Sequence, residues 1–197
     1  LVTWHPGTMA GPALADVLSG DYNPSGKLTL SFPYEVGQLP MRYNHKSTGR
    51  AKTEKNAGEK YISKYMFTPN GPLYGFGDGL SYTEFTYSGL EVLTPSVNVG
   101  EDVKVRVKLT NSGDRDGSEV AQLYVRDIVG STTRPVMELK GFRKVFLKAG
   151  ESATVDFTIK ASDLEFSRAD GQFAQESGDY KLWVGGSTRD LLESSFT

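Results

Sequence analysis

The sequence predicts an α+β chain in two unequal parts: an incomplete α/β unit over residues 1–40 and an antiparallel β-sandwich over residues 85–197. A linker over residues 41–84 joins them. Two observations predict this division. Apolar residues near the N-terminus recur with the period of a helix, whereas from Phe85 onward they alternate with polar residues, as in strands that bury one face.

The N-terminal part contains one helix pattern followed by one strand pattern. A strand end at Leu1 and Val2 precedes them, and Gly20 stands where the helix should end. Leu28, Leu30 and Phe32 alternate with polar residues, which predicts a strand. A parallel βαβ unit needs further strands that the sequence does not supply, so we expect a fragment of an α/β domain. The apolar helix positions are Ala10, Ala13, Leu14, Val17 and Leu18.

The C-terminal part has short alternating runs separated by turn residues about every ten positions. This spacing predicts a sandwich of about seven strands that folds alone, whereas residues 1–60 should not. In the Arg134 to Phe142 segment, Pro135 interrupts the pattern, so we expect Phe142 to be buried and Arg134 to lie at the surface. The strand positions of five aromatic residues predict mostly core packing: Tyr124, Phe142, Phe146, Phe157 and Trp183.

The linker is rich in Lys, Gly, Asn and Pro. Its aromatic residues indicate packing against a surface, with sugar stacking as the alternative. Between Arg42 and Lys60 six basic residues stand against Glu54 and Glu59, which indicates either a solvated loop or a patch for an acidic partner. The aromatic residues are Tyr61, Tyr65, Phe67, Tyr74 and Phe76.

Composition excludes several classes of function. The 22 basic and 24 acidic side chains give no general attraction to nucleic acid or anionic membrane. No apolar run approaches the roughly 20 residues needed to span a bilayer. Without cysteine there is no disulfide or thiolate chemistry. His5 and His45 are forty residues apart with no ligand spacing around them, so no metal and no cofactor is expected.

Four motifs together resemble glycoside hydrolase family 3. The run from Trp4 to Leu28 resembles the end of the family's second domain, and Tyr43 to Arg50 resembles the loop that follows it. Tyr74 to Thr83, YGFGDGLSYT, resembles the entry into the last domain, and Arg134 to Phe142 resembles part of that fibronectin-III-like domain. The resemblance covers nearly the whole chain in the family's order and is strongest to periplasmic β-glucosidases of Gram-negative bacteria.

The resemblance implies a fibronectin-III-like (immunoglobulin-like) sandwich at the end of a retaining β-glucosidase. Such enzymes use two carboxyl groups about 5–5.5 Å apart. In the family both carboxylates belong to the upstream barrel and α/β domains, so no catalytic residue is expected in this chain. The implied partners are those upstream domains, a glucoside or oligosaccharide substrate and a second copy in a homodimer, and the implied location is periplasmic or secreted.

Four residues are candidates for substrate contacts: His45, Lys46, Arg50 and Asp78. Asp78 stands where the family usually has an aromatic residue, so it either changes a sugar contact or lies at the surface. Two other functions stay open. One is an independent carbohydrate-binding module, which exposed aromatic residues on the sandwich would favour. The other is a structural or dimerisation domain.

Overall fold

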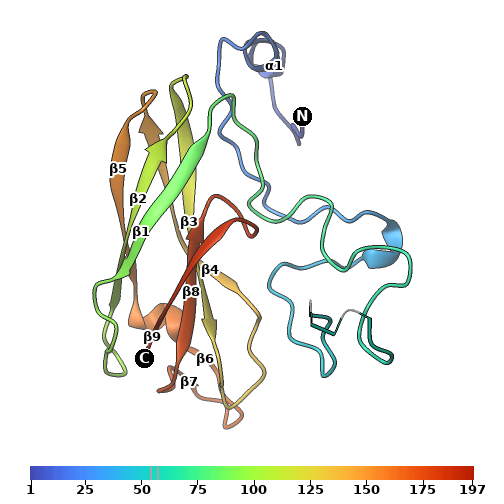
Figure 1. Cartoon of the computed structure of the whole chain (residues 1–197), viewed down its shortest axis with the longest axis vertical. Coiled ribbons are helices and arrows are strands. Elements are labelled where there is room, and N and C mark those ends of the chain that lie inside the picture. The colour runs from blue at the N-terminus through green and yellow to red at the C-terminus, as the bar shows by residue number, and fades with distance from the viewer. Residues whose placement is uncertain (54, 57) are drawn as a thin grey trace.

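The computed structural model describes residues 1–53, 55–56 and 58–197 as a β-sandwich with the N-terminal segment along one flank (Figure 1). The segment contains helix α1 (Ala10–Ser19) and the short 3-10 helix η1 (Val36–Gln38). The sandwich contains β1 (Phe85–Val92), β2 (Val103–Asn111), β3 (Gly117–Asp127), β4 (Glu138–Leu147), β5 (Ser152–Ile159), the 3-10 helix η2 (Ala161–Leu164), β6 (Phe166–Ser167), β7 (Phe173–Ala174), β8 (Tyr180–Gly185) and β9 (Leu191–Phe196).

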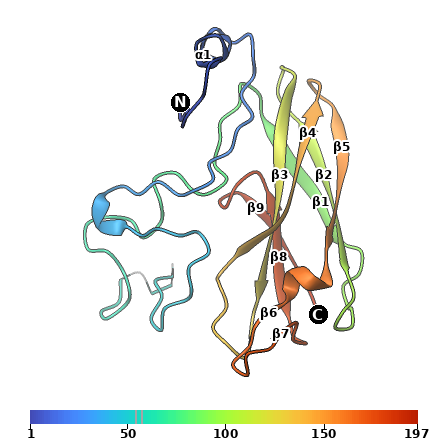
Figure 2. The ribbon, with the colours of Figure 1, turned by 180° about the vertical axis from the view of Figure 1, so that it is seen from behind.

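Seven strands form the two main sheets, which confirms the predicted sandwich. One sheet has the order β1-β2-β5 and the other β4-β3-β8-β9, and all paired strands are antiparallel. A short β6-β7 pair stands apart from them. The four-stranded sheet faces the N-terminal segment, which is seen from behind in Figure 2. β4 and β9 are its edge strands.

The core lies between the two sheets and follows the alternation in the sequence. On β2 the inward residues Val103, Val105, Val107 and Leu109 are fully buried, and the lysines and arginine between them are exposed. Each such side chain contributes about 1.5–3 kcal/mol when it leaves water. The inward faces of β3, β5 and β8 complete this cluster. The sandwich therefore supplies its own apolar core.

The expectation for Phe142 is wrong, because the phenyl ring is 68% exposed. The register of β4 turns Gly141 inward instead. A Cβ on Gly141 would lie 3.2 Å from a ring carbon of Phe157, a tight contact that the Phe157 ring would have to relieve by a small shift. The phenyl ring of Phe146, four positions after Phe142, also lies outside the core and is 60% exposed. Of the other aromatic residues expected in the core, Tyr124 and Phe157 are buried and Trp183 is half-buried.

The expectation that Arg134 lies at the surface is also wrong, because its side chain is only 15% exposed. The guanidinium lies 4.1 Å from the centre of the Phe166 ring and donates to Glu138 at 3.0 Å. Asp127 lies on its other side at 3.8 Å. Arg134 is therefore an internal cation of the sandwich.

The predicted helix is confirmed, and the predicted strand after it is wrong. α1 ends at Gly20, which adopts a left-handed φ of 86°. Residues 28–32 form no strand but one isolated bridge, from Phe32 to Tyr74. Among the described residues, only the irregular stretch 73–78 pairs with this segment, and that is too little to hold a regular ladder. The buried face is also different, since Leu30 is exposed and Ser31 buried.

Of the aromatic residues predicted to pack in the linker, only the last two, Tyr74 and Phe76, have ring contacts. Phe76 stacks on Tyr43 at 4.1 Å between ring centres, and Tyr74 lies near Phe32 at 6.3 Å. Tyr61, Tyr65 and Phe67 are exposed, so the packing expectation is wrong for these three in this chain.

The two phenylalanines Phe157 and Phe142 should respond differently to truncation. Phe157→Ala should lower the free energy of unfolding by about 3–5 kcal/mol, because it leaves a cavity in the core. Phe142→Ala should change it by less than about 0.5 kcal/mol, because the ring is in water. Urea unfolding of both variants in the full chain measures the difference. Equal losses would show that β4 has a different register.

Arg134→Ala should cost about 3 kcal/mol at pH 7, because it leaves the nearly buried Asp127 without its cation. Burial raises the pKa of Asp127, and Arg134 opposes that rise. In the Arg134→Ala variant the pKa of Asp127 in the folded state rises further above its value in the unfolded chain. The variant loses stability as the pH rises from the unfolded-state pKa to the folded-state pKa, so its loss of stability should be smaller at pH 4 than at pH 7.

Urea midpoints at the two pH values test this, with Arg106→Ala as the control. Arg106 forms an exposed pair with Asp156, and its removal should have little effect. A small, pH-independent loss for Arg134→Ala would contradict the internal role of its charge.

Candidate functional site

Three of the four candidate residues lie together in one exposed loop. The His45 carbonyl accepts from the Val136 amide at 2.9 Å, and Lys46 forms an isolated bridge with Pro135. Arg50 donates to the Tyr61 carbonyl at 3.4 Å. The side chains of all three candidates are exposed. Glu54, one of the two acidic residues in the basic stretch, lies outside the described residues.

Asp78 is separate from this loop and is held by its own turn. Its carboxylate accepts from the Gly75 amide at 2.7 Å and lies 3.2 Å from the Arg189 guanidinium. Arg189 also donates to the carbonyls of Pro72 and Leu73. Within the described part of the chain, no hydrogen bond or ion pair joins Asp78 to the other candidates. The carboxylate thus closes a turn against the β8–β9 loop.

A polar cluster that the sequence does not predict lies on β3, where the N-terminal segment meets the four-stranded sheet. Glu119 is buried and pairs with Lys27 at 2.9 Å. The Tyr87 hydroxyl donates to the same carboxylate at 3.1 Å, and burial followed by the charge of Glu119 raises the pKa of Tyr87. The sequence does not identify Glu119 as a buried ion-pair residue, because its partner Lys27 is 92 positions away.

Gln122 lies at the middle of the same contact. Its amide donates to the carbonyls of Gly186 at 2.5 Å and Gly77 at 3.3 Å, and its oxygen accepts from the Tyr124 hydroxyl. Gly77 has a φ of 80°, and a Cβ there would lie 2.3 Å from the Gln122 oxygen. A side chain at position 77 would therefore be both strained and blocked.

A second group of contacts holds the end of α1. Asn23 donates to the Asp116 carbonyl at 2.9 Å and accepts from the Ser81 hydroxyl and the Tyr82 amide, each at 2.9 Å. The Tyr82 hydroxyl donates to the Val17 carbonyl at 2.6 Å, within α1. Arg115 lies over the Tyr82 ring and donates to the Gly20 carbonyl. The helix end is thus connected to the sandwich through side chains.

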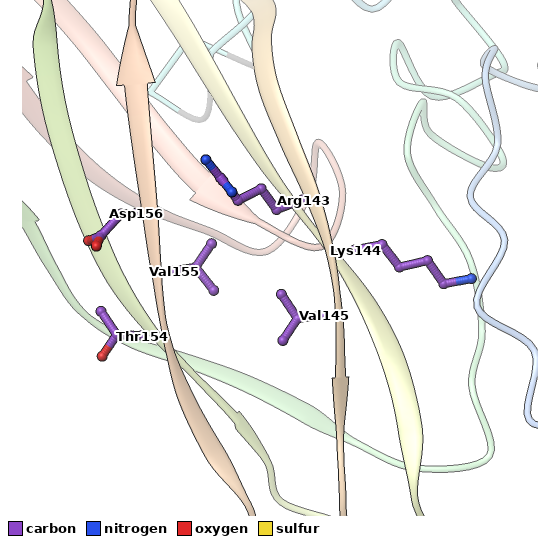
Figure 3. Close-up of a pocket in the computed structure, with 6 residues that line it drawn as sticks. All are labelled: Arg143, Lys144, Val145, Thr154, Val155 and Asp156. Carbon is purple, nitrogen blue, oxygen red and sulfur yellow. The ribbon is translucent and has the colours of Figure 1, made fainter.

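A shallow groove of about 680 Å³ runs between β4 and β5 on the open side of the sandwich. Figure 3 shows Val145 and Val155 pointing toward each other across it, while Lys144 and Asp156 point away. Asp156 is its one lining carboxylate and is held by Arg106 at 2.7 Å, which keeps the pKa of Asp156 low. This groove does not present the pair of carboxyl groups that glycoside hydrolysis requires. It is lined by Arg143, Lys144, Val145, Thr154, Val155 and Asp156.

Residues 1–53, 55–56 and 58–197 contain neither a metal-ligand cluster nor a membrane-spanning helix. No three of the His, Asp and Glu side chains in these residues lie close enough together to bind a metal ion. None of their helices has the length and apolar character needed to cross a membrane.

Comparison with known families assigns both parts of the chain. Residues 1–82 match the glycosyl hydrolase family 3 C-terminal domain, and residues 119–188 match the fibronectin type III-like domain. The two matches follow the order of the fold, with the helix and linker first and the sandwich second.

Similar proteins match along the whole chain. The periplasmic β-glucosidase of Salmonella typhimurium is 44% identical over 196 residues, which are 100% of this chain and 26% of that protein. A β-xylosidase of Formosa agariphila is 39% identical over 201 residues, again 100% of this chain and 26% of that protein. The crystal structure of a β-glucosidase from Listeria innocua with glucose superposes with a TM-score of 0.92 at 45% identity, over 98% of this chain and 27% of that one.

The chain thus spans about a quarter of the length of these relatives. The part that it matches is their C-terminal part, without the catalytic domain. The chain therefore belongs to glycoside hydrolase family 3 and corresponds to the C-terminal region of that family's enzymes.

Proposed function

We propose that this chain serves as the non-catalytic C-terminal part of a β-glucosidase that releases terminal β-D-glucosyl residues with retention. The full-chain match to a periplasmic β-glucosidase, which covers only 26% of that relative, carries the proposal. The partners are the barrel and α/β domains of the same enzyme, and the substrate is a glucoside or an oligosaccharide. The location proposed is the periplasm or the exterior, by similarity to the same relative.

The role proposed for the chain is to hold the last helix of the α/β domain in place. α1 has no buried residue in this structure, so its apolar side is free to pack against that domain. Asn23, Tyr82 and Arg115 fix its C-terminal end to the sandwich. A rigid support of this kind contributes to catalysis by fixing geometry and not by supplying a reacting group.

The candidates His45, Lys46, Arg50 and Asp78 remain proposals for contacts to the sugar. The exposed loop of the first three could reach another domain of the enzyme, because its side chains have few contacts of their own. Asp78 already has two partners, so the turn accounts for its carboxylate without a sugar. A homodimer also stays a prediction, which sedimentation of the purified chain tests.

The isolated 197-residue chain should not hydrolyse an aryl β-glucoside above the uncatalysed rate, because it matches only the C-terminal quarter of its relatives, without the catalytic domain that supplies the carboxyl pair. Release of nitrophenol from p-nitrophenyl β-glucoside measures this. A parallel preparation from host cells without the gene controls for contaminating enzymes. Turnover that co-purifies with the chain and exceeds this control would contradict the proposal.

A further inference from the structure

A short segment, residues 134–138, leads from the β3–β4 connection into β4 and is closed by an ion pair between its two ends. Arg134 and Glu138 form this pair at 3.0 Å. Glu138 is the first residue of β4 and is fixed by the β3–β4 ladder. Pro135 and Val136 lie between the two ends of this entry segment. Their backbone therefore has a set position beside the sheet.

The Arg134 side chain also fixes the entry segment to two other strands. Its guanidinium lies 4.1 Å from the centre of the Phe166 ring on β6 and 3.8 Å from the Asp127 carboxylate at the end of β3. The β3–β4 connection is close to the same side chain, since a Cβ on Gly130 would lie 2.8 Å from the Arg134 Cγ. A side chain with partners on β3, β4 and β6 holds the backbone at position 134 in one orientation.

The entry segment contacts the linker loop that contains two of the candidate residues. The Val136 amide donates to the His45 carbonyl at 2.9 Å. Pro135 forms an isolated antiparallel bridge with Lys46. Both contacts are made by the backbone of residues that directly follow Arg134 in the sequence. A change in the backbone at position 134 therefore reaches His45 and Lys46 through one or two residues.

Other contacts do not hold this part of the loop to the sandwich. In the described part of the chain, every hydrogen bond or bridge between residues 44–50 and the sandwich goes to Pro135 or Val136. Tyr43, just before this stretch, is held independently by an aromatic stack and by the Leu139 amide, which donates to its hydroxyl at 3.2 Å. The entry segment thus determines where the loop lies beyond Tyr43.

We propose that Arg134 is a positioning residue for the loop of His45 and Lys46. By closing the entry segment onto Glu138, it sets the position of these two candidate residues relative to the sandwich. Displacement of a substrate-contacting group by about 1 Å can cost about 100-fold in rate. The inference rests on the proposed function only for the sugar contacts of the loop. Its test measures the loop itself, so it can fail while the proposed function stands.

A nitroxide label on the loop tests the proposal in the full chain. The sequence contains no cysteine, so Lys46→Cys provides a single labelling site. Arg134→Ala should shorten the rotational correlation time of this nitroxide by about twofold or more, because the loop loses its fixed partner. Glu138→Ala should have the same effect, since it opens the entry segment but leaves Arg134 beside Asp127.

Two further measurements separate positioning from general stability. The Val136 amide should exchange with deuterium about tenfold faster in Arg134→Ala than in the parent chain, as followed by NMR, because its local opening no longer breaks a fixed contact. Arg134→Lys should keep both the nitroxide mobility and the Val136 exchange near the parent values. A single donor at 3.0 Å joins Arg134 to Glu138, and an ammonium group can replace it.

Two control variants lie on β2, in the other sheet. Lys108→Cys places the label at an exposed position, where Arg134→Ala should not change its mobility. Leu109→Ala removes a fully buried side chain and should lower the urea midpoint by creating a cavity. Leu109→Ala should nevertheless leave the nitroxide at position 46 and the Val136 exchange unchanged.

Two results would overturn the proposal. One is an unchanged nitroxide at position 46 in folded Arg134→Ala and Glu138→Ala. The other is an equal response to Leu109→Ala, which would show that Arg134 acts only through overall stability. If Arg134→Ala does not fold, Glu138→Ala and Arg134→Lys decide between the same two outcomes.

Discussion

The arrangement of the whole chain depends on buried polar side chains of β3. Gln122 is buried on the outer face of the four-stranded sheet, which would otherwise meet water, and Glu119 is buried on the side that faces the other sheet, where the Tyr87 hydroxyl of β1 donates to it. Each therefore needs a partner, because an unpaired buried polar group costs about 1–3 kcal/mol. The N-terminal segment supplies one partner to each: the Gly77 carbonyl, beside that of Gly186, for Gln122, and the ammonium of Lys27, beside the Tyr87 hydroxyl, for Glu119. This requirement fixes where the segment lies and, through Asn23, where α1 ends.

The sequence predicts the sandwich well because its strands obey a local rule. On β2 and β5 every second residue is apolar, and the period alone indicates which side is buried. On β4 the same period, continued from the inward Val145 and Leu147, places Gly141 inward and Phe142 outward. The expectation for Phe142 followed the apolar character of the residue and not this period. The prediction for residues 28–32 fails for a different reason, because strand formation depends on neighbours that only the tertiary fold provides.

The candidate site was predictable only in part. Motifs identified the loop of His45, Lys46 and Arg50 and the turn of Asp78, but nothing in their spacing showed that the two are separate. Glu119 and Gln122 were missed because nothing in the sequence distinguishes them from the other polar residues of β3, Ser118, Arg126 and Asp127. Their role depends on contacts with Lys27 and Gly77, which are far away in the sequence. The exposed Phe146 was missed because its apolar character was given more weight than its position between the inward Val145 and Leu147.

The sandwich supplies its own core but uses residues 20–82 to cover its outer face. The free energy of unfolding of residues 85–197, compared with that of the full chain, distinguishes these two contributions. The fragment should fold and unfold cooperatively, but with a stability about 2–4 kcal/mol lower, because the stacked Phe76 and Tyr43 no longer cover Tyr124. A fragment as stable as the full chain would contradict the docking of the segment, and an unfolded fragment would contradict the independence of the core.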